Sequence, residues 1–288
     1  EWWLTLKWGR RYRDLPFLDK HGRSFKYCLP DAVLELLHQI DQDASGAIQT
    51  ETPILNPAIR DTFMVRSLME EAITSSQLEG AATTRAAAKE MLREGRPPRD
   101  RSERMIVNNY RGMRLIKTFA DQPLALARIL KLHRVMTIDT LDNKLAVGRL
   151  RRPEEDIHVV DHRDGMLLHT PPAAEELPDR VERQCIFANE AKTGAFLHPV
   201  LRAIILHFAL AYDHPFADGN GRTARALFYW SLLRHDYWLA EFVSISPLLK
   251  QAPAEYARAF LYSETDDNDL TYFILHQLRA FVRAIDDL

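Results

Sequence analysis

The length, composition and charge of the chain exclude several classes of protein. Its 288 residues include 38 Lys and Arg against 40 Asp and Glu, so the formal net charge of -2 argues against a protein that coats nucleic acid. Hydrophobic residues make up 46% and charged residues 27%, as in soluble globular proteins and unlike disordered or membrane-spanning ones. At about 150 residues per domain, this length suits one large domain or two small ones.

Residues 1–56 are expected to form an N-terminal arm and one helix. Trp2, Trp3 and Trp8 lie beside basic residues, as in an arm that binds nucleic acid. Because the whole chain is slightly acidic, we expect instead that these aromatic side chains pack against the body and that the charges face solvent. An amphipathic helical pattern then begins at Asp31 and closes near Gly46.

Residues 57–100 form a second segment. Apolar residues at helical spacing follow Pro57, and Gly80 supplies the stop signal of that helix. A short helix is expected from Thr84 to Arg93. The turn cluster at residues 95–100 then marks the start of the main domain, residues 101–288.

The main domain is predicted to be almost entirely helical. The apolar periodicity indicates helices at residues 105–119, 124–138, 175–190, 198–212, 221–235, 253–262 and 269–285. One stretch differs, because two short apolar runs flank Asp164 and Gly165, a dipeptide typical of hairpins. The predicted fold is therefore mostly α, a helical bundle with a small β-hairpin.

The two cysteines and the apolar runs bear on location. Cys28 and Cys185 lie far apart in the sequence and cannot build a disulfide framework or a zinc ribbon, so we expect a cytoplasmic protein. The apolar run at residues 201–212 is well short of the roughly 20 residues that a membrane helix needs. We therefore expect no membrane partner.

The residues with the clearest chemistry lie in the segment 214–225, between two apolar helices. Gly219 and Gly221 flank Asn220, which lets the backbone turn and its N–H groups converge on an anion. The helix that starts just after Gly221 adds the partial positive charge of its N-terminus. Arg222 and Arg225 share one face of that helix and suit phosphate oxygens. The pattern predicts a site for a polyphosphate.

Two further residues of this segment suggest catalysis. Asp218 is an oxygen ligand of the kind that Mg²⁺ accepts when phosphates and water fill its other positions. His214 could remove a proton from a hydroxyl near neutral pH. Base, metal ligand and phosphate-binding groups thus share one short loop.

The motif HxFxDGNGRxxR at residues 214–225 resembles the signature of the Fic family of nucleotidyl transferases, and every fixed position matches. The resemblance extends from about residue 30 to residue 285. It implies that His214 deprotonates a target hydroxyl, that Asp218 holds Mg²⁺, and that Asn220 with the Gly219 and Gly221 backbone binds the phosphates of ATP. Arg222 and Arg225 would then fix the β- and γ-phosphates, with Arg222 also offsetting charge during catalysis.

Two other segments are similar to features of that family. Ser75, Glu79 and Gly80 match its inhibitory motif, in which a Glu79–Arg225 ion pair would block productive binding of the γ-phosphate. The helix dipole also disfavours a Glu near a helix C-terminus, which independently suggests a cationic partner. The alternative is a solvated Glu at the end of the helix.

The predicted hairpin, residues 157–170, resembles the family's flap, whose edge pairs with the target backbone. Ile157, His158 and Val159 would form that edge. Asp161 and His162 stand where small residues are common, which weakens the match.

Two assignments remain outside these motifs. Tyr256 could stack on the base of the nucleotide or pack in the core. A second group of histidines does not indicate a metal hydrolase, because no HExxH motif and no second carboxylate accompany them: His158, His162, His169, His198 and His207.

The expected function is an autoinhibited protein adenylyltransferase that uses ATP and Mg²⁺. Its partner would be a target protein with a Ser, Thr or Tyr hydroxyl. Self-modification and a homodimer are both left open. Binding of nucleic acid would require a segment outside this chain. The alternatives are transfer of UMP, phosphate or phosphocholine, removal of AMP, or a nucleotide-sensing module without turnover.

Overall fold

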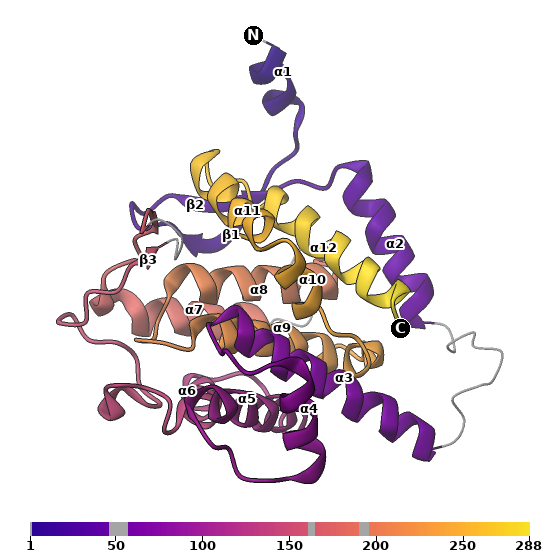
Figure 1. Ribbon diagram of the computed structural model, residues 1–288. Coiled ribbons are helices and arrows are strands. Elements are labelled where there is room, and N and C mark those ends of the chain that lie inside the picture. The colour runs from indigo at the N-terminus through magenta and orange to yellow at the C-terminus, as the bar shows by residue number, and fades with distance from the viewer. Residues whose placement is uncertain (1, 46–56, 161–164, 190–195) are drawn as a thin grey trace.

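The computed structural model describes residues 2–45, 57–160, 165–189 and 196–288. They form a helical bundle with two small antiparallel hairpins, as Figure 1 shows. The predicted end of the first helix at Gly46, the end of another at Glu190, and Asp161, His162 and Asp164 of the predicted hairpin lie outside the described residues. The division of the chain at residues 56 and 100 stays a prediction.

The regular elements follow one another in this order. The α-helices are α1 Trp2–Gly9, α2 Asp31–Ser45, α3 Pro57–Leu78, α4 Arg85–Glu94, α5 Arg101–Lys117, α6 Leu126–Thr137, α7 Leu177–Asn189, α8 Pro199–Asp213, α9 Asn220–Arg234, α10 Ser246–Gln251, α11 Pro253–Thr265 and α12 Thr271–Asp286. The strands are β1 Arg13–Leu18, β2 Ser24–Tyr27, β3 Val159–Val160 and β4 Leu167–His169. Short 3-10 helices lie at Lys144–Ala146, Ala174–Glu176 and Trp238–Glu241.

The helices predicted for residues 57–288 are confirmed, with ends that differ by a few residues. Side-chain caps explain two of the starts: Thr84 Oγ1 accepts a bond from the Ala87 amide at 3.3 Å, and Asp100 Oδ1 accepts one from the Glu103 amide at 2.8 Å. The sequence did not predict α10, because a six-residue helix is too short to display a period.

Helices α8 and α9 form the centre of the bundle (Figure 1). Almost every side chain of α8 is buried, as its apolar sequence on all faces requires. Helices α7 and α12 pack against α8, while α3, α5 and α6 pack against α9. The loop that joins α8 to α9 is the segment 214–219, so the predicted site lies between the two most buried helices.

The N-terminal region differs from the prediction in two ways. Strands β1 and β2 form a hairpin that the sequence did not reveal, and Phe25 on β2 packs edge-on against Phe208 of α8 at a centroid distance of 5.1 Å. The strands are short and β1 contains Pro16, so alternation gave no clear signal. The expected packing of the tryptophans was also wrong.

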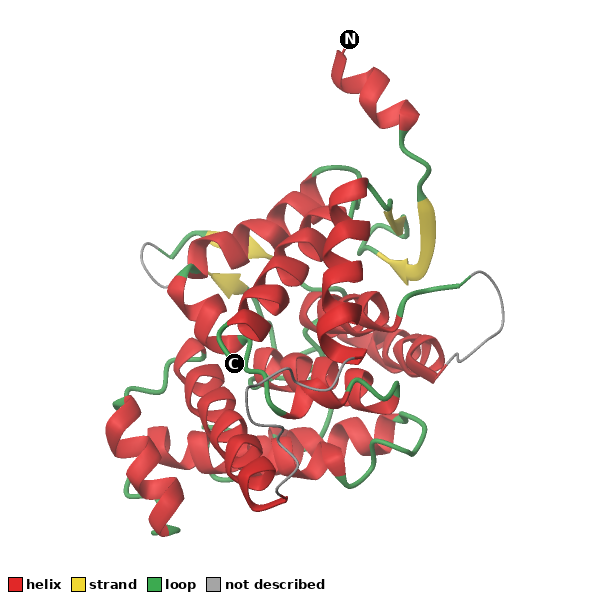
Figure 2. Cartoon of the chain, turned by 90° about the vertical axis from the view of Figure 1, so that its right-hand side faces the viewer, coloured by secondary structure: helices red, strands yellow, loops and turns green. Residues whose placement is uncertain are grey.

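Helix α1 stands away from the body in both Figure 1 and Figure 2. Trp2 and Trp8 are 76% and 89% exposed. Two basic side chains hold this segment: Lys7 pairs with Asp266 and Asp267, and Arg10 pairs with Asp269 at 3.0 Å. Arg11 and Arg13 are exposed, as expected. Ion pairing with an acidic loop therefore replaces the burial of aromatic rings that we expected.

The predicted flap hairpin is present but small. Strands β3 and β4 pair antiparallel, with Val159 opposite His169, and Ile157 and His158 precede the strand. His169 fastens β4 to the bundle through contacts with the Tyr212 carbonyl at 2.7 Å and the Glu264 carboxylate at 2.8 Å.

Within the described ranges, every helix is too short or too polar to span a lipid bilayer.

Candidate active site

Two residues with left-handed backbone conformations shape the loop between α8 and α9. His214 ends α8 with φ 45°, and Gly219 precedes α9 with φ 82°. The Asn220 side chain closes the loop, since its Oδ1 accepts a bond from the Phe216 amide at 2.9 Å and its Nδ2 donates to the Phe216 carbonyl at 2.8 Å. The side chain of Asn220 is thus engaged in closing the loop.

His214 has the protonation state that a general base needs. Its Nδ1 lies 3.1 Å from the Ala211 carbonyl oxygen, which can only accept, so Nδ1 carries the proton. The lone pair of Nε2 is then available. Burial lowers the pKa of His214 to about 4, although the bond to Ala211 acts in the opposite direction. The ring is therefore neutral at pH 7.

Arg151 holds the start of the loop. Its Nε donates to the His214 carbonyl at 2.9 Å, and its backbone N–H donates to the Pro215 carbonyl at 2.8 Å. A further bond runs from its Nη2 to the Pro172 carbonyl, at the end of the flap. The side chain is buried. No role was assigned to Arg151 from the sequence.

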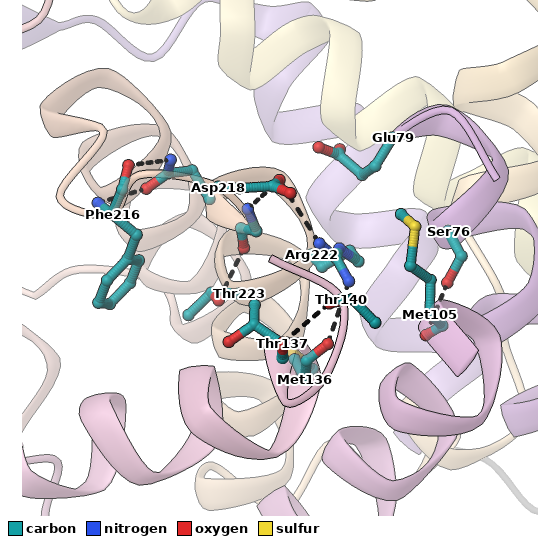
Figure 3. Close-up of polar contacts among 12 residues, drawn as sticks. Ser76, Glu79, Met105, Met136, Thr137, Thr140, Phe216, Asp218, Arg222 and Thr223 are labelled. Atoms are coloured by element: carbon teal, nitrogen blue, oxygen red, sulfur yellow. Dashed lines mark hydrogen bonds and ion pairs between the residues drawn. The ribbon is translucent and has the colours of Figure 1, made fainter. Parts of the chain in front are cut away.

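Arg222 and Arg225 are both fully buried near the loop, and Figure 3 shows Arg222 beside Asp218. Arg222 donates from Nη1 to the Met136 carbonyl at 3.1 Å, and its Nη2 lies 3.5 Å from Asp218 Oδ1. Its Nε has no partner in the described part of the structure. Burial lowers the pKa of Arg222, which marks it as a cation that would gain from a further anion.

Arg225 contacts the end of α3. Its Nε donates to Ser75 Oγ at 2.9 Å, and its Nη2 donates to Glu79 Oε1 at 2.8 Å. The structure therefore contains the ion pair that the sequence assigned to these residues. Burial disfavours the charged Arg225, but the Glu79 carboxylate outweighs that effect and raises the pKa of the guanidinium.

The Glu79 carboxylate lies at the N-terminus of α9. A Cβ atom on Gly221 would fall 2.2 Å from Glu79 Oε1, so carboxylate and helix start are in direct contact. Figure 3 shows the Glu79 side chain pointing toward Asp218 and Arg222 from the end of α3. Burial alone would raise the pKa of Glu79, but Arg225 lowers it. An anion thus already occupies the place predicted for a phosphate.

Asp218 is the most accessible polar group of the loop. Its side chain is 40% exposed, and Oδ1 accepts a bond from the Gly219 amide. The described residues contain no cluster of three His, Cys, Asp or Glu that could hold a metal by itself. One exposed carboxylate fits Mg²⁺ that arrives with phosphates and keeps its waters.

Tyr256 and His133 complete the surroundings. Tyr256 Oη lies 2.8 Å from Nε2 of the buried His207, and its ring packs edge-on against Phe260 at 5.3 Å. The structure thus shows Tyr256 packed against its neighbours, and its stacking on a nucleotide base stays a prediction. His133 of α6 contacts the Asp218 carbonyl at 2.9 Å. No motif in the sequence pointed to His133, which lies far upstream of the loop and has no recognisable spacing to it.

Several known proteins are similar to this chain. Residues 123–232 match the model of the Fic/DOC family. A protein of Nematostella vectensis named protein adenylyltransferase Fic is 25% identical over 260 residues, which cover 88% of this chain and 55% of that protein. A protein of the same name from Drosophila grimshawi is 28% identical over 200 residues, 68% of this chain and 38% of that protein. The chain spans about half the length, or less, of these curated relatives.

Two solved structures show the same fold. A Fic family protein from Desulfovibrio desulfuricans G20 aligns with a TM-score of 0.72 at 20% identity, over 91% of this chain and 75% of that chain. A Fic domain containing signaling protein from Bacteroides thetaiotaomicron aligns with a TM-score of 0.70 at 22% identity, over 88% of this chain and 94% of that chain.

Proposed function

Because residues 123–232 belong to the Fic/DOC family, we propose that this chain is a protein adenylyltransferase that is held inactive by its own Glu79. It would move AMP from ATP to a Ser, Thr or Tyr hydroxyl of a target protein. The observation that carries the proposal is the loop itself: a neutral imidazole at one end and two buried guanidinium groups at the other. The names of the curated relatives support the same activity.

The reaction begins with a target hydroxyl beside His214. As its oxygen attacks the α-phosphorus of ATP, the proton passes to Nε2 of His214, which has the free lone pair. The bond between the α-phosphorus and the bridging oxygen breaks, and pyrophosphate leaves with the electron pair. Arg222 and Arg225 offset the charge on the departing phosphates.

Asp218 would hold Mg²⁺ in this proposal, and the ion would supply further positive charge beside the phosphates. The backbone of residues 219–221 would bind those phosphates at the N-terminus of α9. The flap would place the target, because the free edge of β3 can pair with an extended peptide without demanding a particular sequence. Val159 is the part of the predicted docking edge that lies in a strand.

Glu79 would inhibit by taking the place of an anion. Its carboxylate holds Arg225 and lies against Gly221, so a γ-phosphate in that position would meet like charge and lose its guanidinium partner. Nucleotide would then bind in an unproductive pose. Removing the carboxylate should free both Arg225 and the helix start.

The proposal predicts that Glu79→Gly increases self-modification in the presence of ATP and Mg²⁺, and that adding His214→Ala abolishes it. Intact-mass spectrometry of the three proteins, incubated under equal conditions, measures the number and the mass of the added groups. Glu79→Gln is a matched control, because it retains the hydrogen-bonding shape but loses the charge, and its rate should fall between those of the wild type and the Gly variant.

The added mass also separates the alternatives. An increment of one AMP supports the proposal, whereas an increment of UMP, phosphate or phosphocholine from the corresponding donor would replace it with another transfer. Loss of AMP from a premodified target would indicate the reverse reaction. Tight ATP binding without product in all three proteins would overturn the transferase and leave a nucleotide-sensing module.

A further inference from the structure

His133 is a buried residue of α6. It lies where this helix and the segment after it, which contains Gly148, meet the active-site loop. Its exposed fraction is 0%, and its ring stacks on Phe216 with a centroid distance of 3.8 Å and an interplanar angle of 8°. Phe216 belongs to the loop and is also fully buried. The imidazole therefore lies face to face with the segment that carries His214 and Asp218.

The two ring nitrogens have different partners, which define the tautomer. The Gly148 amide lies 3.1 Å from Nδ1 and can only donate, so Nδ1 carries no proton in the neutral ring. Nε2 then carries the proton and donates to the Asp218 carbonyl at 2.9 Å. Both nitrogens are satisfied by backbone groups, and the ring acts as a fixed bridge between residues 148 and 218.

The bond to the Asp218 carbonyl orients a peptide group of the site. That carbonyl belongs to the planar peptide that joins Asp218 to Gly219, so holding its oxygen also sets the direction of the Gly219 N–H. The Gly219 N–H in turn donates to Oδ1 of Asp218. The position of the Asp218 carboxylate thus depends on the orientation of a peptide that His133 holds.

The local backbone would otherwise restrain this peptide weakly. Gly219 adopts φ 82°, a conformation that glycine reaches without steric cost, and no Cβ limits its rotation. A Cβ there would lie 2.7 Å from Thr137 Cγ2 and 3.5 Å from His133 Cδ2, so α6 packs directly against this residue. Contacts from α6 therefore replace the steric restraint that a side chain would give.

We propose that His133 is a positioning residue of the nucleotide site. Its Nε2–H holds the Asp218–Gly219 peptide in the orientation that directs the Asp218 carboxylate toward the Mg²⁺ that accompanies ATP. His133 does not touch the reacting atoms. The inference rests on the proposed function of the same loop, and it adds a residue to which no role in that function was given.

Three substitutions separate the functions of the ring. His133→Gln places an amide N–H near the position of Nε2 and keeps the donor to Asp218. His133→Asn can accept from the Gly148 amide but is too short to reach Asp218. His133→Phe keeps a ring against Phe216 and loses both bonds. Each is made in a Glu79→Gly background for kinetics, and in Glu79→Gly with His214→Ala for binding of ATP and Mg²⁺ without turnover.

The Phe and Asn variants should bind Mg²⁺ and ATP about tenfold more weakly by calorimetry, which is the effect of one hydrogen bond. Their KM for ATP should rise by a similar factor, with a smaller change in kcat. The Gln variant should stay within about threefold of His133 in both measurements. Titration with Mg²⁺ at constant ATP should show the same order, because Asp218 is the group that loses its orientation.

His198→Gln is the matched control. His198 caps α8 at the end away from the loop, where it contacts Asp41 at 2.9 Å. If the loss of binding came only from lower stability of the fold, His198→Gln would show the same loss. Equal binding in the Phe variant and the parent, or equal loss in the Gln and Asn variants, overturns the inference. If the Phe variant fails to fold, the comparison of Gln with Asn decides.

The outcome for His133 can be distinguished from the outcome for the proposed function. If Glu79→Gly with intact His133 forms no product, the transferase proposal fails, while nucleotide binding still reports on His133. If that variant is active and the Gln, Asn and Phe variants all match it in KM and in binding, only the role of His133 is refuted.

Discussion

Gly221 lacks a side chain where the Glu79 carboxylate approaches α9. An added Cβ would lie 2.2 Å from Glu79 Oε1 and 3.0 Å from Arg225 Nη1. The second of these contacts needs the Arg225 guanidinium to move by only a few tenths of an ångström. The first involves a carboxylate that Arg225 holds in place. Glycine at this position is therefore explained by Glu79 rather than by the helix.

This explanation predicts a dependence between two substitutions. Gly221→Ala should destabilise the wild type by about 1–3 kcal/mol, because the carboxylate must move. In the Glu79→Gly background it should be neutral or stabilising by up to about 1 kcal/mol, because Ala suits a helix better than Gly. Urea unfolding of the four proteins measures the coupling. Equal costs in the two backgrounds would show that Glu79 does not determine this position.

A single buried carboxylate fastens α3 to the rest of the bundle. Glu71 is 2% exposed, and its Oε2 accepts bonds from Tyr229 Oη at 2.9 Å, Ser244 Oγ at 2.8 Å and the Ser246 amide at 3.0 Å. Ser246 Oγ donates to the other oxygen. Because Glu79 follows directly after the last residue of α3, these bonds also help to set its position against α9.

Removing this anchor should cost much stability. Glu71→Ala leaves several buried donors without an acceptor, so we expect the free energy of unfolding to fall by roughly 2–4 kcal/mol. Hydrogen exchange should show the largest loss of protection in α3. Glu35→Ala, at an exposed position of α2, is the control and should change stability by less than about 0.5 kcal/mol. A cost similar to that of the control would contradict the anchoring role.

Several buried histidines set how the stability of the whole molecule responds to pH. Burial lowers the pKa of His133 and of His214 to about 4, and that of His207 well below its usual value. In the unfolded chain these groups titrate near pH 6.5. Below that pH the unfolded state binds protons that the folded state does not, so stability falls as the pH decreases from about 6.5 to 4.

Other groups act in the opposite direction or outside this range. Burial raises the pKa of Asp213 to about 6, because the buried carboxylate is unfavourable in its charged form. Protonation of Asp213 therefore stabilises the folded state as the pH falls through 6. The carboxyl groups of Asp19, Glu103 and Glu155, whose pKa values are about 2, lose their contribution only below about pH 4. Burial also lowers the pKa of His235 and His276. The net effect between pH 7 and 5 therefore comes from five histidines against one aspartate.

We therefore expect the Tm to be nearly constant from pH 8 to 7 and to fall from pH 6.5 to 5. Thermal unfolding followed by circular dichroism across this range is the measurement. His133→Gln removes one titrating group and should reduce the slope. A Tm that rises on acidification from pH 7 to 5 would mean that Asp213 dominates.

Local sequence predicted the helices of the main domain, the short hairpin and the residues of the loop, because periodicity, glycines and polar spacing act over a few neighbouring positions. It did not predict β1 and β2, or the exposed tryptophans of α1. Those depend on contacts with α8 and with the acidic segment 266–269, which lie far away in the chain. Propensity in short segments is overridden by such contacts.

The sequence by itself determined the chemistry of the loop, since His214, Asp218 and the two arginines are adjacent in the chain and their types limit what they can bind. Only the tertiary structure decided how they are held. Arg151 hydrogen-bonds to a carbonyl at the start of the loop, and His133 hydrogen-bonds to one near its end. Glu79, directly after α3, pairs with Arg225. These three residues meet the loop only after the chain has folded, because packing and buried hydrogen bonds, not sequence spacing, bring them there.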